Sequence, residues 1–242
     1  MPFPPLSDGR ARLSTQRYDK RDIPLTFSRQ TAYYIRTMII IESKRKKRET
    51  ILRQYPGAIV CDVTSHAKDG LVRLSPFYPH GGIPVPFSEG WTATCVEAVW
   101  QGLKVFEHAD VDTAMFGNDT MRNIKRTVRR FGKPLGHRKG VNGKELLGYI
   151  EARKQIYLPT YRWMLEHKDM DIIERLRKAS KTETIVLLDY NTNCDVDDPK
   201  QPLSHAFLVK AYAEGLYPYD DINSKKNDSN KPTQLSLFEQ DQ

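Results

Sequence analysis

The chain contains little cysteine and no long apolar run. Its three cysteines, Cys61, Cys95 and Cys194, are odd in number and far apart, and none belongs to a C-x-x-C pair. This pattern argues against a disulfide framework or a zinc knuckle and favours a reducing compartment. No segment approaches the roughly 20 apolar residues that span a bilayer, and the first ten residues lack the features of a secretory signal. We therefore expect a cytoplasmic protein.

Metal-ligand spacing is also missing. The histidines show no pattern that would hold an ion, and a buried cysteine such as Cys95 is more often a small apolar residue than a nucleophile. The sequence therefore predicts neither a metal nor a cofactor. The histidines are His66, His80, His108, His137, His167 and His205.

Positive charge, by contrast, is plentiful. The 242 residues carry a formal net charge of +8. Such a balance favours an anionic partner, which includes nucleic acid, nucleotides and phosphate-bearing ligands. Five consecutive cations at 44–48 either contact phosphates or form a solvated helix face.

The patterning predicts an α+β fold. Residues 34–65 indicate a strand, a helix capped by Ser43 and a second strand. Helical spacing then dominates the segments 117–132, 143–159, 160–168 and 169–180, with Gly or Pro between them. A buried strand follows within 182–190, and a closing helix is capped by Ser204. We expect an extended or partly disordered arm at 1–30, a helix-rich single domain with few strands at 31–219, and a disordered tail at 220–242.

The segment "TATCVEAVWQGLKVFE" carries the strongest chemical pattern. Thr94 and Glu97 form a capping-box pattern, so a helix is predicted to start there. Glu97, Gln101 and Lys104 then fall at i, i+4 and i+7, on a stripe beside the apolar face. A half-buried carboxylate and amine have environment-dependent proton affinities, which suits catalysis. The alternative is that Glu97 only closes the cap while the other two face water.

The loop just upstream, "LSPFYPHGGIPVPFSEGW", is rich in aromatic residues and proline. Phe77, Tyr78, Phe87 and Trp91 could present their rings to a planar base. The alternative is that these rings pack into the core.

These motifs resemble those of the NADAR family, also called YbiA-like. The similar elements are "SPFYP" at 75–79, Trp91, and the spacing of Glu97, Gln101 and Lys104. The segments "YPGAIVCDVTS", "SPFYPHGGIPVP", "VWQGLKVFE" and "GHRKG" look like a divergent branch of bacterial and phage proteins of unassigned function. The resemblance covers about residues 50–215. Ala98 stands where the family usually has histidine.

The resemblance implies a hydrolase that acts on N-glycosidic bonds of ribosylated compounds, with a NADAR-type fold. Lys104 matches the lysine proposed to attack the anomeric carbon and hold the ribose as a Schiff base. Glu97 matches a glutamate suited to proton transfer, and Asp189 a carboxylate that follows a buried strand. These three are the expected catalytic residues.

The same resemblance implies a set of substrate-binding residues. Aromatic and amide side chains would line the base and ribose pocket, and Arg138 would grip a diphosphate, unless it lies in a solvated surface turn. The expected substrate-binding residues are Phe77, Tyr78, Trp91, Trp100, Gln101, Arg138 and Asp195.

An apolar island, "QLSLF" at 234–238, follows the polar linker. It matches the pentapeptide by which bacterial DNA-processing proteins dock onto the sliding clamp of DNA polymerase. Its apolar side chains would fill a groove, and the polar tether would give reach. The alternative is that the tail packs on its own domain. The expected clamp-binding residues are Gln234, Leu235, Ser236, Leu237 and Phe238.

Three hypotheses about function follow. The first is an enzyme that removes ADP-ribose, or a related ribosyl group, from a nucleobase, with guanine in DNA as a plausible target. The second is a small-molecule N-glycosidase that acts on a nucleotide metabolite or NAD. The third is a non-catalytic module that binds ADP-ribose or modified DNA.

Overall fold

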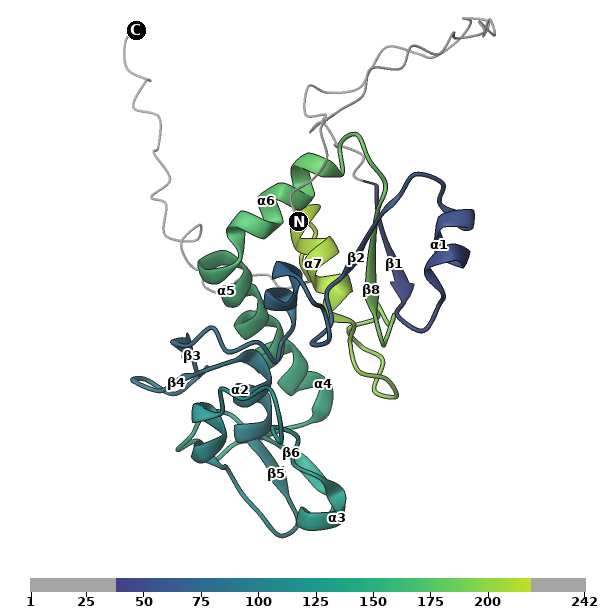
Figure 1. The fold of residues 1–242 in the computed structure, drawn as a ribbon. Coiled ribbons are helices and arrows are strands. Elements are labelled where there is room, and N and C mark those ends of the chain that lie inside the picture. The colour runs from purple at the N-terminus through teal and green to yellow at the C-terminus, as the bar shows by residue number, and fades with distance from the viewer. Residues whose placement is uncertain (1–37, 219–242) are drawn as a thin grey trace, which may run out of the picture. The chain divides into compact units, whose positions relative to one another are not determined.

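The computed structural model describes residues 38–218, which fold as a single α+β domain with three small sheets (Figure 1). The predicted α+β class is confirmed. The arm at 1–30 and the tail at 220–242, with its motif at 234–238, lie outside the described residues.

The strands are β1 (Ile39–Ser43), β2 (Ile59–Asp62), β3 (Ile83–Pro84), β4 (Thr92–Ala93), β5 (Lys104–Phe106), β6 (Pro134–Arg138), β7 (Leu146–Leu147) and β8 (Ile185–Asp189). The α-helices are α1 (Arg48–Gln54), α2 (Val96–Gly102), α3 (Val128–Phe131), α4 (Tyr149–Ala152), α5 (Leu158–Lys168), α6 (Met170–Ala179) and α7 (His205–Ala213). Short 3-10 turns are η1 (Gly70–Leu74) and η2 (Thr113–Gly117), and η3 (Arg153–Tyr157) is a π turn.

The main sheet is parallel, with strand order β1-β8-β2. Its strands are rich in β-branched residues, and β8 is buried along its whole length. Near-continuous apolar runs of this kind are typical of parallel strands covered on both faces. The strand–helix–strand unit predicted at 34–65 and the strand predicted within 182–190 are both present, and β8 lies between the two strands of that unit.

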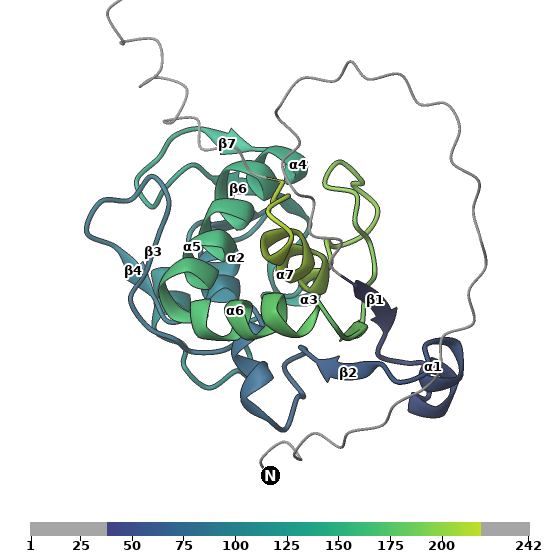
Figure 2. The same cartoon turned by 90° about the horizontal axis from the view of Figure 1, so that it is seen from above.

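Alternate residues of this sheet face two different layers. Val186 and Leu188 pack with Ile51 of α1 on one side. Ile185 and Leu187 point into the main core, which also contains residues of α6 and α7. Figure 2 shows the same arrangement, with α1 on one side of the strands and α6 and α7 on the other. The period of two along each strand produces this separation.

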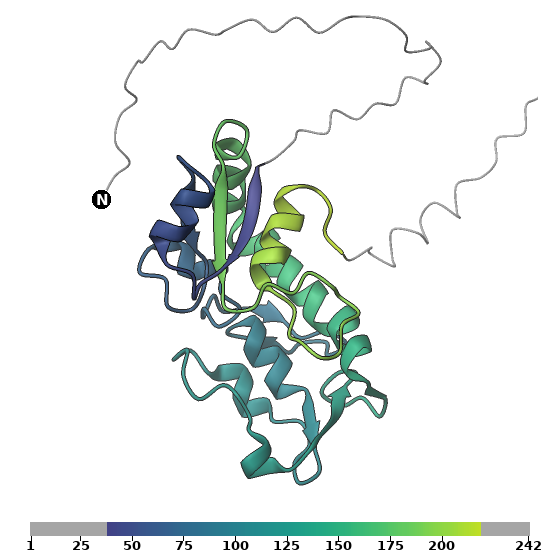
Figure 3. The same cartoon turned by 90° about the vertical axis from the view of Figure 1, so that its right-hand side faces the viewer.

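The carboxyl ends of the three parallel strands meet at one edge. The register places Ser43 beside Asp189, and Asp62 beside Leu188. In Figure 3 the chain leaves β8 at this edge and continues through a long loop to α7. Ligands of parallel sheets bind outside the carboxyl ends of the strands, so this edge is where a site is expected.

The antiparallel sheet β5-β6-β7 lies next to α2. Helix α2 ends at Gly102, where a side-chain carbon would lie 2.3 Å from the ring of Phe116. Only glycine fits this contact, and the chain leaves the helix directly afterwards to start β5 at Lys104. The predicted helix is therefore shorter than its sequence pattern indicated, and Lys104 is not part of it.

Three other sequence predictions are wrong in detail. Ser43 ends β1 and does not cap α1, which begins after Lys47. The segment 117–132 is mostly irregular, because Met121 and Asn123 have positive φ angles of 57° and 55°, and only α3 is helical. Pro159 does not separate two helices, because it occupies the first turn of α5, where proline is tolerated.

Other predicted elements are confirmed. Helix α6 occupies most of 169–180, and α7 begins after Ser204, whose hydroxyl accepts a hydrogen bond from the Phe207 amide. Within residues 38–218, no helix has the length and apolar character needed to cross a membrane.

Candidate functional site

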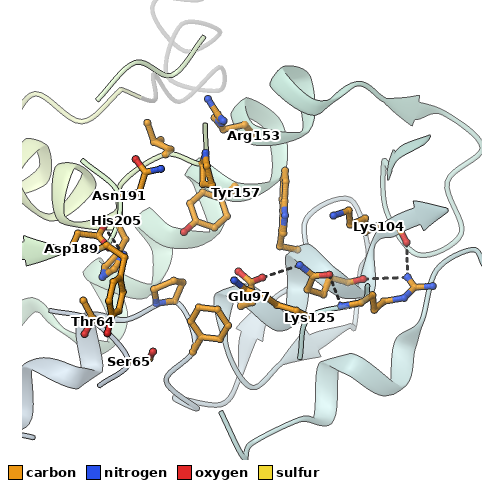
Figure 4. Close-up of a pocket in the computed structure, with 18 of the residues that line it drawn as sticks. Thr64, Ser65, Glu97, Lys104, Lys125, Arg153, Tyr157, Asp189, Asn191 and His205 are labelled. Atoms are coloured by element: carbon orange, nitrogen blue, oxygen red, sulfur yellow. Dashed lines mark hydrogen bonds and ion pairs between the residues drawn. The ribbon is translucent and has the colours of Figure 1, made fainter. Parts of the chain in front are cut away.

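A cavity of about 480 Å³ lies between the carboxyl edge of the main sheet, α2, β5 and the π turn η3. This volume falls in the range of small-molecule sites. We call it the main cavity. Figure 4 shows Thr64, Asp189 and His205 at one end, Tyr157 and Glu97 in the middle, and Lys104 at the other end. It is lined by Thr64, Ser65, Pro76, Phe77, Glu97, Trp100, Gln101, Lys104, Lys125, Arg126, Tyr149, Arg153, Tyr157, Asp189, Tyr190, Asn191, Pro202, Leu203 and His205.

Glu97 is available to the cavity because it does not close a capping box. Cys95 is the N-cap of α2 and accepts from the Ala98 amide, while the Thr94 hydroxyl donates to the Asn118 carbonyl oxygen. The Glu97 carboxyl accepts at Oε1 from Gln101 Nε2, 2.9 Å away. Burial raises the pKa of Glu97, against the opposing effects of Gln101, Lys125 and Lys104. A carboxyl in this setting can hold a proton nearer neutrality than a solvated one.

Gln101 is in turn fixed by Arg126, whose backbone amide donates to Gln101 Oε1 at 3.1 Å. The Arg126 guanidinium donates to the carbonyl oxygens of Lys104, at 2.5 Å, and of Asp110, at 2.8 Å. Arg126 therefore ties the end of α2 to β5 and orients the pair formed by Glu97 and Gln101. Sequence spacing gave no indication of this arginine.

Lys104 lies at the start of β5 and extends its amine toward the middle of the main cavity (Figure 4). Within the described chain it forms no ion pair, and its amine lies 5.2 Å from the centre of the Phe106 ring. Burial lowers the pKa of Lys104. The charge of Glu97 opposes this effect, whereas Arg126 and Lys125 lower the pKa further. A larger fraction of the amine is therefore neutral and nucleophilic than in a solvated lysine.

Trp100 forms an aromatic wall together with Tyr149 and Tyr157, whose ring centres lie 6.0 and 5.7 Å away. Behind Trp100 lies His137, with its ring centre at 3.7 Å. Burial lowers the pKa of His137 to about 3, with a contribution from Lys104, so the imidazole is neutral. Phe77 supplies a further aromatic surface of the cavity. These rings can hold a planar apolar group.

Asp189 reaches the cavity, but its carboxylate is already engaged. Oδ2 accepts from the Ser204 hydroxyl at 2.7 Å and lies 3.0 Å from His205 Nδ1. The other ring nitrogen of His205 lies 2.8 Å from the Val63 carbonyl oxygen, so both nitrogens face acceptors and the ring is an imidazolium. Burial favours a higher pKa for Asp189, but His205 and Ser204 outweigh it and lower that pKa.

This arrangement assigns Asp189 a positioning role. The carboxylate joins the end of β8 to the first turn of α7 and, through His205, to the end of β2. It therefore fixes the loop of Thr64 and Ser65 at the cavity edge, and it is not a poised general base.

Arg153 holds the loop that follows β8. Its guanidinium donates to the carbonyl oxygens of Val196 at 2.7 Å, Asp198 at 2.9 Å and Gln201 at 2.8 Å. Since this loop carries Asn191 to the cavity, Arg153 stabilises that wall through backbone contacts.

Four of the predicted substrate-binding residues do not line the main cavity. Tyr78 packs against His80, and Trp91 lines a separate hollow with Phe87. Asp195 is exposed and uses its side chain within its own turn, where Oδ1 accepts from the Asp197 amide. Of the four aromatic residues named in this loop, Phe77 lines the main cavity and the other three do not.

Arg138 is the fourth, and it lies in a different surface hollow, beside Lys144. Its guanidinium makes two bonds to Asp110, from Nε at 3.0 Å and from Nη2 at 2.8 Å. Nη1 donates to the Lys144 carbonyl oxygen. With its donors used in this way, Arg138 does not reach a ligand in the main cavity. Lys125 is the additional cation there, 5.6 Å from the Phe77 ring centre and without an ion pair among the described residues.

Ala98, which stands where the NADAR pattern has histidine, is fully buried in the main core. Its side chain packs away from the main cavity.

No group of three or more His, Cys, Asp or Glu side chains within 38–218 is arranged to hold a metal ion.

Comparison with known proteins connects the chain to one family. Residues 43–209 match the family of unknown function DUF6939. The chain belongs to this family. The matched region extends from the end of β1 to α7 and contains every residue that lines the main cavity. No curated protein matches the chain.

Proposed function

We propose that this DUF6939 protein is an N-glycosidase that removes ADP-ribose, or a related ribosyl group, from a nucleobase through a Schiff base on Lys104. The observation that carries the proposal is the convergence of Lys104, Glu97 and Gln101 in one cavity beside Trp100 and Phe77. The resemblance to the NADAR family supports the same chemistry and a NADAR-type fold.

The reaction would begin with attack of the neutral Lys104 amine on the anomeric carbon. The glycosidic carbon–nitrogen bond breaks, its electron pair goes to the base, and Glu97 supplies a proton to that base. The amine then loses a proton to Glu97. The bond between the anomeric carbon and the ring oxygen breaks as that oxygen takes the proton from Glu97, which leaves a protonated imine between the anomeric carbon and Lys104. Water hydrolyses the imine and restores the free lysine.

The other residues that line the cavity would have the following roles in this reaction. Phe77 and Trp100 would contact the base, and Lys125, whose amine lies 5.6 Å from the Phe77 ring centre, would attract a phosphate. Lys125 thus takes the role that the resemblance assigned to Arg138. Asp189 fixes the opposite end and takes no part in proton transfer.

Two other functions have specific support. A small-molecule N-glycosidase acting on a nucleotide metabolite or NAD would use the same residues, and the cavity volume suits such a ligand. A non-catalytic module that binds ADP-ribose is favoured by the engaged state of Asp189 and by Ala98.

Delivery to DNA would depend on the tail. The motif at 234–238 lies outside the described residues, and we propose that it binds the bacterial sliding clamp. The net charge of +8 suits work on DNA.

Borohydride trapping tests the proposed chemistry. Purified protein is incubated with DNA that carries ADP-ribosylated guanine, reduced, and analysed by intact mass. We expect an ADP-ribosyl adduct in the wild type and in Lys144→Ala, a control lysine outside the main cavity, and none in Lys104→Ala. The yield should rise with pH through the lowered pKa of Lys104, because the neutral amine is the nucleophile.

The outcomes separate the three functions. Trapping with ADP-ribose or NAD but not with modified DNA would favour the small-molecule enzyme. Binding of ADP-ribose without trapping, retained in Lys104→Ala, would favour the binding module. An adduct that persists in Lys104→Ala would contradict the assignment of the nucleophile.

A further inference from the structure

The π turn η3 interrupts the helix between α4 and α5 at the wall of the main cavity. Turns of this kind contain one residue more than an α-helical turn and occur frequently at functional sites. Tyr149, Arg153 and Tyr157 follow at four-residue intervals, and all three line the cavity. In a regular α-helix each such step advances about 40° beyond a full circle, so side chains eight residues apart diverge. The wider turn reduces that divergence and keeps Tyr157 on the cavity side.

Neighbouring rings fix the position of Tyr157. The ring of Trp100 meets it edge-on at 5.7 Å, and the ring of Tyr161 stacks beside it at 6.1 Å. In Figure 4 the Tyr157 hydroxyl points into the cavity, in the region between Glu97 and Asp189. The hydroxyl is therefore held in place before any ligand arrives.

This hydroxyl differs from those of the tyrosines around it. Tyr161 donates to the Leu74 carbonyl oxygen at 2.5 Å, and Tyr217 donates to the Leu158 carbonyl oxygen at 2.9 Å. Within residues 38–218, the Tyr157 hydroxyl makes no hydrogen bond. The side chain is half-buried and lines the cavity, so its hydroxyl is open to a hydrogen-bond partner bound there.

The chemistry of the partner follows from the charge around the hydroxyl. Burial raises the pKa of Tyr157 well above its usual value, and the charges of Glu97 and Asp189 raise it further, so the phenol stays protonated at neutral pH. It is an uncharged donor, in contrast to Lys104, which lies at the other end. The negative charges of Glu97 and Asp189 disfavour an anionic oxygen beside this hydroxyl, which leaves an uncharged acceptor such as a sugar hydroxyl or ring oxygen.

We propose that Tyr157 is a specificity-determining residue of the main cavity and donates its hydroxyl hydrogen to a sugar oxygen of the ribosyl ligand. This inference depends on the proposed function, because the ribosyl group supplies the acceptor.

Tyr157→Phe is the test, since it removes the hydroxyl and keeps the ring. Binding of ADP-ribose is measured by calorimetry, and the melting temperature is measured without ligand. Loss of one hydrogen bond to the ligand is expected to weaken binding about 3- to 10-fold. The melting temperature should stay the same or rise, because no protein group loses a partner.

Tyr161→Phe is the matched control. It removes a hydroxyl that is bonded to the Leu74 carbonyl oxygen, so its melting temperature should fall while its affinity for ADP-ribose stays at the wild-type value.

Two failures can be told apart. If the wild type binds ADP-ribose and Tyr157→Phe binds it equally well, the role of Tyr157 is overturned and the proposed function stands. If the wild type binds none of ADP-ribose, NAD and ribose 5-phosphate, the proposed function is overturned, and the inference with it.

Discussion

At the scale of single residues, the side chains that line the main cavity are of two kinds. Some have polar groups that are open to a ligand, and others have polar groups that bond to the protein. Lys104 carries an unpaired amine, and the Tyr157 hydroxyl lacks a bond within the described chain. Asp189 and Arg153 line the same space, but their polar atoms bond to the protein. The first pair would act on a ligand, and the second pair shapes the cavity.

The buried pair of Asp189 and His205 predicts a pH-dependent stability. The pKa of His205 is raised in the folded state, so its contribution is complete below the unfolded value of about 6.5 and is lost as pH rises through the folded pKa. The pKa of Asp189 is lowered, so its contribution is present above about pH 4 and is lost in acid. The contribution of the pair is therefore largest between these values.

Asp189→Asn tests this expectation. The change leaves His205 buried without its carboxylate and should lower the free energy of unfolding by about 3 kcal/mol near pH 6. Urea unfolding between pH 5 and 9 should show the difference from wild type shrinking as pH rises through the folded pKa of His205. A difference that stayed constant across this range would show that the ion pair is not its source.

At the scale of elements, the cavity depends on irregular segments that regular helices and strands hold in place. The loop after β8 forms part of the cavity wall, and the Arg153 guanidinium holds it by donating to three of its carbonyl oxygens. A buried arginine with several charge-assisted bonds can stabilise such a loop strongly.

Arg153→Gln should release this loop. Trypsin cleavage after the exposed Lys200 is expected to become several-fold faster, since proteolysis follows local opening. Lys154→Gln is the matched control, because Lys154 reaches the same loop through an exposed ion pair with Asp197, and such pairs contribute little. Equal cleavage rates in the two variants would contradict the role of Arg153.

Element patterns explain what the sequence could and could not predict. Apolar periodicity predicted β1, β2, β8, α6 and α7 near their observed positions. A strand or helix with a buried face has apolar residues at regular intervals, which the sequence shows directly. The spacing of Glu97, Gln101 and Lys104 correctly predicted that the three side chains lie together, but it wrongly placed Lys104 on the same helix. The helix ends at Gly102, which packs closely against Phe116, and Lys104 reaches the cavity from β5.

Other features left little trace in the sequence. No local pattern marks a π turn, so Tyr157 was missed. Contacts between distant segments, such as Arg126 with Gln101, cannot be obtained from spacing within one segment. The pair of Asp189 and His205 could have been predicted. Asp189 ends a buried strand, and His205 directly follows the helix cap Ser204.

At the scale of the whole molecule, the proposed roles of the cavity and of the motif at 234–238 can be tested separately. The family match ends at residue 209, well before the motif at 234–238. If the motif serves only for docking, its loss will not change the chemistry of the cavity.

Removal of residues 220–242 should abolish binding to a purified bacterial sliding clamp in a fluorescence anisotropy assay. Borohydride trapping with free ADP-ribose should be unchanged. Replacement of Leu237 and Phe238 by alanine in the full chain should have the same effect, because these apolar side chains would fill the groove. Undiminished clamp binding after either change would exclude the motif as the docking segment.

The position of β8 also has a consequence for how the protein is made. During synthesis β1 and β2 emerge early, but the strand that lies between them follows more than 120 residues after β2. Until β8 arrives, each of the early strands lacks the partner it pairs with in the finished sheet, and such unpaired edges favour aggregation. Almost the whole domain must therefore be synthesised before the sheet can close, and we expect nascent chains that end before β8 to be prone to aggregation.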